Sequence, residues 1–145
     1  MVSSVAKLAY AQQIIEIRPI SFGTVVVLDN STVGSINIDA IGNVNISNHF
    51  AIIAPPLYGE FQLLNYPVNA NLFLSGGILQ GQSSTPVFSP EQFTLTAVNV
   101  LGIVNIGNDG SAIIRAGGRL ETSGSGSLSF GDTTYTSRII ITVNF

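Results

Sequence analysis

The sequence predicts an all-β fold, an antiparallel sandwich or barrel of about seven to nine short strands. Runs of Val, Ile, Leu and Phe alternate with polar residues at a period of two, the pattern of strands with one buried face. Gly, Pro, Asn and Asp interrupt these runs about every 8 to 12 residues, as turns do in antiparallel sandwiches and barrels. Helical periodicity is hard to find along the chain.

The length of 145 residues favours a single domain, which we place at residues 14–145 after an N-terminal extension at residues 1–13. A domain of this size buries roughly 70% of the surface of its unfolded chain, so it needs no disulfide. The sequence has no cysteine, so no disulfide can form. Ala9 and Ala11 in the extension form the A-x-A pattern of a signal-peptidase site, but the apolar stretch that a signal peptide needs is missing.

Strands are expected in eight segments of the chain. In order, these are residues 12–23, 24–28, 34–47, 60–64, 70–76, 93–107, 111–123 and 136–145. Pro19 lies inside the first segment and predicts an edge strand or a bend, because proline cannot donate to a strand ladder. The pair Pro55 and Pro56 ends any regular strand that reaches it.

Three stretches between or inside these segments are predicted to turn or bulge. Residues 108–110, NDG, are a tight-turn signal of the kind that favours a positive φ. Residues 116–119, AGGR, indicate a bulge or a turn. Residues 81–92, GQSSTPVFSPEQ, are the longest candidate loop.

The segment TSRIIITVNF, residues 136–145, is the clearest amphipathic strand. Ile139, Ile141, Val143 and Phe145 alternate with mostly polar neighbours, and burying this face is worth roughly 1.5–3 kcal/mol per side chain. A slip of one residue would exchange that face for a polar one, so the register should be strongly fixed. We expect a C-terminal core strand at the centre of a sheet, with the domain ending at Phe145.

Composition limits the function. Only 9% of the residues are charged, against about 25% in a typical soluble domain. A charge-poor surface is common in exported all-β proteins and in subunits that neighbours cover. The net charge is −3 and the five basic residues are scattered, so we expect no nucleic-acid binding. No apolar run reaches the roughly 18 residues of a membrane-spanning helix.

No catalytic, cofactor or metal motif stands out, and we expect neither enzymatic activity nor a cofactor. His49 is the only histidine, and we interpret it as a loop or strand-edge residue, because no second histidine or cysteine could complete a metal site. The eight carboxylates are dispersed and form no calcium loop. The glycine-rich stretch 123–131 lacks the helix that follows a phosphate-binding loop. Asn30 and Asn45 begin N-glycosylation patterns of low specificity.

Motifs near both ends of the chain resemble a known family. ISFGTV stands at residues 20–25, GRLE at 118–121, and GDTTYTSRIIITVNF ends the chain. They resemble an uncharacterised family of exported proteobacterial domains, a domain of unknown function, over roughly residues 14–145. Ser137 stands where that family usually has glycine, and Phe145 where it has tyrosine. The resemblance implies an immunoglobulin-like antiparallel β-sandwich, similar to pilin and spore-coat subunits, and it implies no known enzyme activity.

One candidate function is an exported structural subunit of a bacterial surface filament, such as a pilus or fimbria, or of a coat. Subunits would assemble by β-strand complementation, in which one chain adds an extended segment to a sheet of its neighbour. Residues 1–12 are the candidate donor, with Ala6, Leu8 and Tyr10 facing the acceptor; the competing interpretations are a flexible tail and a signal remnant. The partner would be a second copy in a homopolymer, with an assembly chaperone as a further candidate, outside the cell or at its surface.

The alternative function is a monomeric extracellular binding module, an adhesin for a surface glycan or a receptor. Loops on a rigid sandwich commonly carry such sites. Tyr58 and Tyr66 lie in loops that contain proline and, with residues 81–92, are the candidate ligand loops. A packing role for each tyrosine is the competing interpretation.

Overall fold

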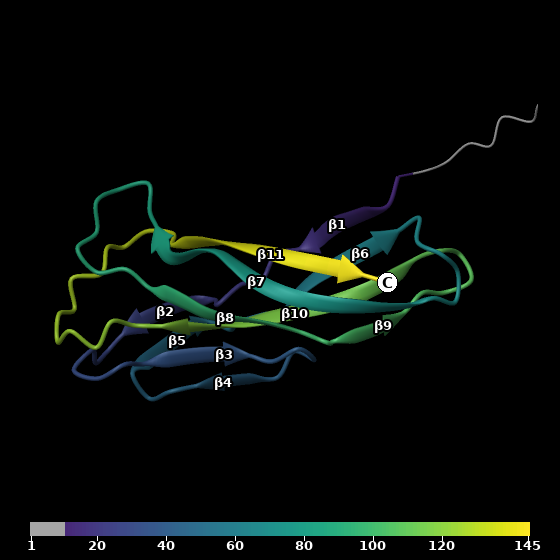
Figure 1. Cartoon of the computed structure of the whole chain (residues 1–145). Helices are drawn as coiled ribbons and strands as arrows, with labels where there is room; N and C mark the ends of the chain where they lie inside the picture. Colours follow the sequence, from purple (N-terminus) through teal and green to yellow (C-terminus); the bar gives the residue numbers. More distant parts are fainter. Residues whose placement is uncertain (1–10) are drawn as a thin grey trace, which may run out of the picture.

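The structure is a computed structural model that describes residues 11–145, and eleven strands lie in that part of the chain (Figure 1). They are β1 (Gln13–Arg18), β2 (Thr24–Val27), β3 (Ser35–Ile38), β4 (Val44–Ile46), β5 (Phe50–Ala54), β6 (Gly59–Leu64), β7 (Asn71–Ser84), β8 (Thr94–Val100), β9 (Ile103–Asn105), β10 (Ala112–Glu121) and β11 (Thr136–Asn144). The all-β prediction is confirmed, with more strands than the seven to nine expected.

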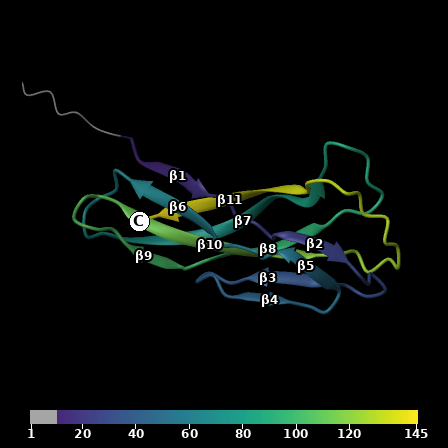
Figure 2. The ribbon, with the colours of Figure 1, turned by 180° about the vertical axis from the view of Figure 1, so that it is seen from behind.

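Nine of the strands belong to one sheet, and β2 and β5 form a separate pair. The longest path through the large sheet is β1-β6-β10-β8-β7-β11, with β3, β4 and β9 attached at its sides. Every pair of neighbouring strands is antiparallel. Figure 2 shows β1, β6, β7 and β11 in the upper part of the molecule and β2 to β5 in the lower part.

The prolines end strands as the sequence predicts. β1 is the first strand of the path and pairs with β6 alone among the described strands, so it is an edge strand, and it ends immediately before Pro19. β5 ends immediately before Pro55. The NDG turn is also confirmed, since Gly110 has a φ of 76°.

β10 is the strand on which the sheet is organised. One of its edges pairs with β8, and its other edge pairs first with β6, through residues 112–116, and then with β3, through residues 118–121. Gly117 stands where the partner changes, and a Cβ there would collide with the backbone carbonyls of Ile38 and Asp39. The AGGR stretch is therefore not a turn, because it continues β10, although the register against β8 does shift between Arg119 and Leu120.

The strand predicted at residues 70–76 is longer in the structure, because β7 continues to Ser84. The predicted loop at residues 81–92 is therefore wrong in its first part. Gly76, Gly77 and Gly81 lie within β7. A Cβ on Gly76 would come within 2.6 Å of a Val98 methyl group, so this glycine permits a close approach of β8. Glycine usually weakens a strand, which is why the composition indicated an end there.

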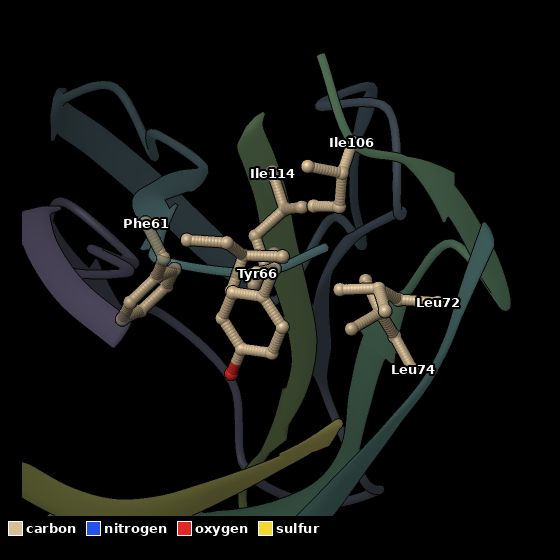
Figure 3. Packing of buried hydrophobic residues seen from close by; sticks show 8 residues of the cluster. Phe61, Tyr66, Leu72, Leu74, Ile106 and Ile114 are labelled. Atoms are coloured by element: carbon tan, nitrogen blue, oxygen red, sulfur yellow. The ribbon is translucent and has the colours of Figure 1, made fainter. Parts of the chain in front are cut away.

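Two clusters of buried side chains form the core. The larger cluster lies between β6, β7, β10 and the segments next to them; its buried members are Phe61, Leu63, Tyr66, Leu72, Leu74, Ile106, Ile114 and Ala116. Figure 3 shows the Tyr66 ring between Phe61 on one side and Leu72 and Leu74 on the other. The smaller cluster has Ile36, Phe50 and Phe93 at its centre.

The C-terminal strand is placed differently from the prediction. β11 pairs with β7 alone among the described strands and is the last strand of the path, so it lies at an edge and not at the centre of the sheet. Its predicted face is correct over three residues, since Ile139, Ile141 and Val143 pack against the larger cluster. Phe145 is 69% exposed and meets Tyr66 edge to face, with ring centroids 6.2 Å apart. Alternation identifies the buried face of a strand, but an edge strand can bury one face as well as a central strand does.

Replacement of Gly117 tests the crossing at β10. We expect Gly117→Ala to lower the free energy of unfolding by about 1–3 kcal/mol, because the added methyl group must displace the backbone of Ile38 and Asp39. Gly102→Ala is the matched control, since a Cβ at that position meets no atom within 4 Å. Urea unfolding followed by circular dichroism measures both. Equal stability of the two variants would contradict the account.

Candidate functional site

A groove separates the two ends of the strand path. It is lined by Ile14 and Glu16 of β1, Phe61 of β6, and Ile139 and Ile141 of β11, with a volume of about 270 Å³. β1 and β11 are the first and last strands of the path, so the sheet must curl to bring them to one groove. Figures 1 and 2 both show β1 and β11 near each other in the upper part of the molecule.

Each of the two strands has one edge without a strand partner in residues 11–145. β1 pairs only with β6 there, and β11 pairs only with β7. Five antiparallel steps separate β1 from β11 along the path, so the two strands run in opposite directions. A strand that entered the groove would therefore be antiparallel to one of them and parallel to the other.

The register of β1 determines which side chains enter the groove. Ile14 is opposite Leu63 and Glu16 is opposite Phe61. Directly opposed residues share a face of the sheet, and Leu63 and Phe61 are both core residues with 0% and 7% exposure. Ile14 and Glu16 therefore point to the inner side, whereas Ile15, opposite Gln62, points to the outer side.

The side chains that line the groove are apolar apart from one carboxylate. Phe61 is buried, Ile139 and Ile141 are half-buried, and Glu16 is exposed. The nearest arginine in sequence, Arg18, is engaged elsewhere: its Nε donates to the Tyr58 carbonyl at 3.0 Å and its Nη2 lies 3.6 Å from a Glu60 oxygen. Within the described chain, no basic side chain lies at ion-pair distance from Glu16.

The predicted donor residues Ala6, Leu8 and Tyr10 lie outside the described residues. The proposed division after residue 13 falls at the start of β1, which begins at Gln13.

The candidate ligand tyrosines stand at opposite ends of β6 and do not share a site. Tyr66 is 8% exposed within the larger core cluster, and its burial raises the pKa of the phenol. Tyr58 is half-buried, and two guanidinium groups lie close to its ring centroid, that of Arg18 at 4.6 Å and that of Arg115 at 4.7 Å. The competing packing interpretation agrees with the burial of Tyr66, and Tyr58 has contacts with two arginines.

The third candidate ligand segment is the loop between β7 and β8. Val87 is 56% exposed and Phe88 is 91% exposed. These two apolar side chains lie in the part of residues 81–92 that the structure leaves as loop, after β7 ends at Ser84. They are the feature of this loop that could contact a partner.

His49 is held by two hydroxyl groups. One ring nitrogen lies 2.8 Å from Thr32 Oγ1 and the other lies 2.9 Å from Ser47 Oγ. Residues 11–145 contain no group of three or more His, Asp or Glu residues that could hold a metal ion. The histidine thus has a structural environment next to β5.

A polar cluster that the sequence did not predict orders the serine-rich stretch after β10. Asn30 is 1% exposed; its amide nitrogen donates to the Ser127 carbonyl at 2.7 Å, and its amide oxygen accepts from the Gly124 N–H at 2.8 Å. Glu91 accepts hydrogen bonds from the hydroxyls of Ser125 and Ser123 at 2.7 and 2.8 Å, and these bonds lower the pKa of the Glu91 carboxyl. The alternating serines of SGSGSLS were the available signal.

The burial of Asn30 bears on its N-glycosylation pattern. An asparagine that is 1% exposed and bonded through its amide on both sides is not available for modification in the folded chain. Asn45 of β4, in the second pattern, is exposed.

Two findings complete the description of the site. Among the described residues, no helix is long and apolar enough to cross a membrane. The chain matched no family model, no curated protein and no solved structure. The structure therefore establishes an all-β domain with antiparallel sheets. The resemblance of the motifs to a family stays a prediction.

Replacement of Asn30 tests the polar cluster. We expect Asn30→Ala to lower the free energy of unfolding by about 1–3 kcal/mol, because it leaves the partly buried Gly124 N–H and Ser127 carbonyl without their partner. Asn45→Ala is the matched control and should change stability by no more than about 0.5 kcal/mol. Chemical denaturation of both variants is the measurement. A loss confined to the control, or equal in both, would contradict this role.

Proposed function

We propose that the chain is an exported structural subunit of a bacterial surface filament or coat, and that its subunits assemble by β-strand complementation. The observation that carries the proposal is the groove between β1 and β11. It combines an apolar floor with one unpaired strand edge on each side, among the strands of residues 11–145. An unpaired edge is a template for pairing with another chain, and proteins normally protect such edges.

A single extended strand satisfies both features of the groove at once. Its backbone would pair with the free edges of β1 and β11, and its alternate side chains would cover Phe61, Ile139 and Ile141. Main-chain hydrogen bonds supply affinity in this mode of recognition, and pockets for every second side chain supply specificity. A helix would leave both edges unpaired, because its backbone groups bond within the helix.

The donor that we propose is residues 1–12 of a second copy, with Ala6, Leu8 and Tyr10 inward. This segment has the alternation that a groove-filling strand requires. Insertion into the groove of the same chain would need a tight hairpin directly before β1. Residues 5–18, VAKLAYAQQIIEIR, contain no Gly, Pro, Asn or Asp to form one. The sequence therefore favours exchange between copies.

The surface composition supports a subunit that neighbours cover. Apolar side chains lie exposed on the small pair β2 and β5 and next to it, with Ile53 at 70% and Leu28 at 57%. On the outer face of the large sheet, Ile113 is 61% and Ile103 is 58% exposed. Contacts between subunits would remove this area from water, which is favourable by about 25 cal/mol per Å².

The proposal includes a specific fold, an immunoglobulin-like sandwich similar to that of pilins. In an immunoglobulin-like, pilin-like sandwich, the strand from a neighbour would complete the sheet between β1 and β11. The charge-poor composition favours export, which would place the protein at the cell surface. A chaperone that occupies the groove before assembly is a further expected partner, because the open groove leaves Ile14 exposed and Ile139 and Ile141 only half-buried.

The second candidate, a monomeric binding module, has one observation in its favour. Val87 and Phe88 lie exposed in the loop between β7 and β8 and could contact a receptor or a glycan. In this version the loop residues replace Tyr58 and Tyr66 as the site, because Tyr66 is in the core and the Tyr58 ring lies against Arg18 and Arg115.

A single charge in the donor segment tests the filament function. We expect Leu8→Asp to abolish polymers of the full chain, because it would place a carboxylate against the apolar floor of the groove. Ala9→Asp is the matched control: the same charge one residue later faces solvent and should leave assembly intact. Negative-stain electron microscopy and size-exclusion chromatography are the measurements.

Two results would contradict the proposal. The first is a monomeric unaltered chain at all concentrations tested, and the second is normal assembly of both Leu8→Asp and a chain without residues 1–12. Loss of binding to a glycan array on Phe88→Ser, in a chain that stays monomeric, would favour the binding module.

A further inference from the structure

Glu16 is the one charged side chain among the described residues that line the otherwise apolar groove, and a strand that enters the groove must cover it. Its side chain lines the groove with Ile14, Phe61, Ile139 and Ile141. A covered carboxylate without a hydrogen-bond donor is strongly unfavourable, whereas one that accepts a hydrogen bond is tolerated. Glu16 therefore distinguishes between strands that bring a donor to its position and strands that do not.

We propose that Glu16 selects the incoming strand and sets its register by accepting a hydrogen bond from the phenol hydroxyl of Tyr10 of a second copy. This inference rests on the proposed function, since it concerns the same groove and the same donor segment. It adds the residue that recognises the donor, the donor atom that is recognised and the direction of the inserted strand.

Filling of the groove favours Tyr10 over Lys7 as the partner of Glu16. In an inserted, extended strand the two residues would lie on opposite faces, because their positions differ by an odd number. The face with Tyr10 also carries Leu8, so two large side chains follow at consecutive inward positions. The face with Lys7 offers Val5 and Ala9 next to it, which are smaller than Leu8 and Tyr10 and fill less of a groove of about 270 Å³ between isoleucines.

The lengths of the two edges indicate the direction of the inserted strand. β11 has nine residues and β1 has six. Antiparallel pairing is somewhat more stable per residue than parallel pairing, so the strand should be antiparallel to β11, the longer edge, and parallel to β1.

The register follows from this direction. Parallel to β1, the spacing from Leu8 to Tyr10 matches the spacing from Ile14 to Glu16, so Leu8 lies beside Ile14 when Tyr10 lies beside Glu16. The reverse direction would place Gln12 beside Ile14. Only the proposed direction places the apolar Leu8 beside the apolar Ile14.

A double-mutant cycle in the full chain tests the proposal. The variants are Tyr10→Phe, Glu16→Met and the two together, and the readout is the monomer concentration in equilibrium with polymer after pelleting. In the chain that keeps Glu16, we expect Tyr10→Phe to raise this concentration roughly tenfold to a hundredfold, because the covered carboxylate loses its donor. In the chain that carries Glu16→Met, we expect Tyr10→Phe to have less than about a twofold effect, because no carboxylate remains.

Lys7→Met is the matched control and should leave the monomer concentration unchanged. A large rise in monomer concentration for Lys7→Met, with no change for Tyr10→Phe, would overturn the proposal, since the Lys7 face of the strand would then enter the groove. The proposed exchange of strands between subunits would not be contradicted by that result. Equal effects of Tyr10→Phe in both backgrounds would also overturn it. An unaltered chain that never polymerises would overturn the proposed function as well.

Discussion

The outer edges of β1 and β11 each carry a row of backbone N–H and C=O groups without a strand partner in the described chain. These two unpaired edges are the feature on which the account of the structure depends. The path of six strands begins and ends at these rows. Because the path curls, the two rows border one groove, where Ile139 and Ile141 are only half-buried above the buried Phe61. The apolar face of β11 is only half-buried for the same reason.

The remaining strands hold this open arrangement in place. β10 lies near the middle of the path and joins the two halves of the molecule, because it changes partner from β6 to β3 at Gly117. Gly76 plays a similar part in β7, where it admits Val98 of β8. Away from the groove, the polar contacts of Asn30 and Glu91 fix the long stretch between β10 and β11. Away from the groove, strand pairing and these polar contacts therefore hold the domain together.

Sequence reasoning predicted local features better than positions within the sheet. Alternation identified the inward face of β11 correctly at Ile139, Ile141 and Val143, and Pro19 correctly indicated an edge strand. The place of β11 at an edge was not predictable, because it depends on which strands pair far apart along the chain. The glycines of β7 and β10 do not end their strands for a related reason: their role lies in contacts with Val98 and Ile38, which are distant in the sequence.

The candidate site shows the same limit. The interpretation of His49 as a loop or strand-edge residue agrees with its place immediately before β5, and the packing interpretation of Tyr66 agrees with its burial. Glu16 gave no signal, since a lone carboxylate in a strand segment normally faces solvent. Its position beside Ile139 and Ile141 follows only from the register of β1 on β6 and from the curl of the sheet.

Amide hydrogen exchange, compared between the dissociated and the assembled chain, tests the central claim most directly. If a strand enters the groove, the outward-facing amides of β1 and β11 exchange rapidly in the monomer and become strongly protected in the polymer, together with amides of residues 1–12. Protection that appears instead at other exposed strands such as β4 or β5, with β1 and β11 unchanged, would contradict the account.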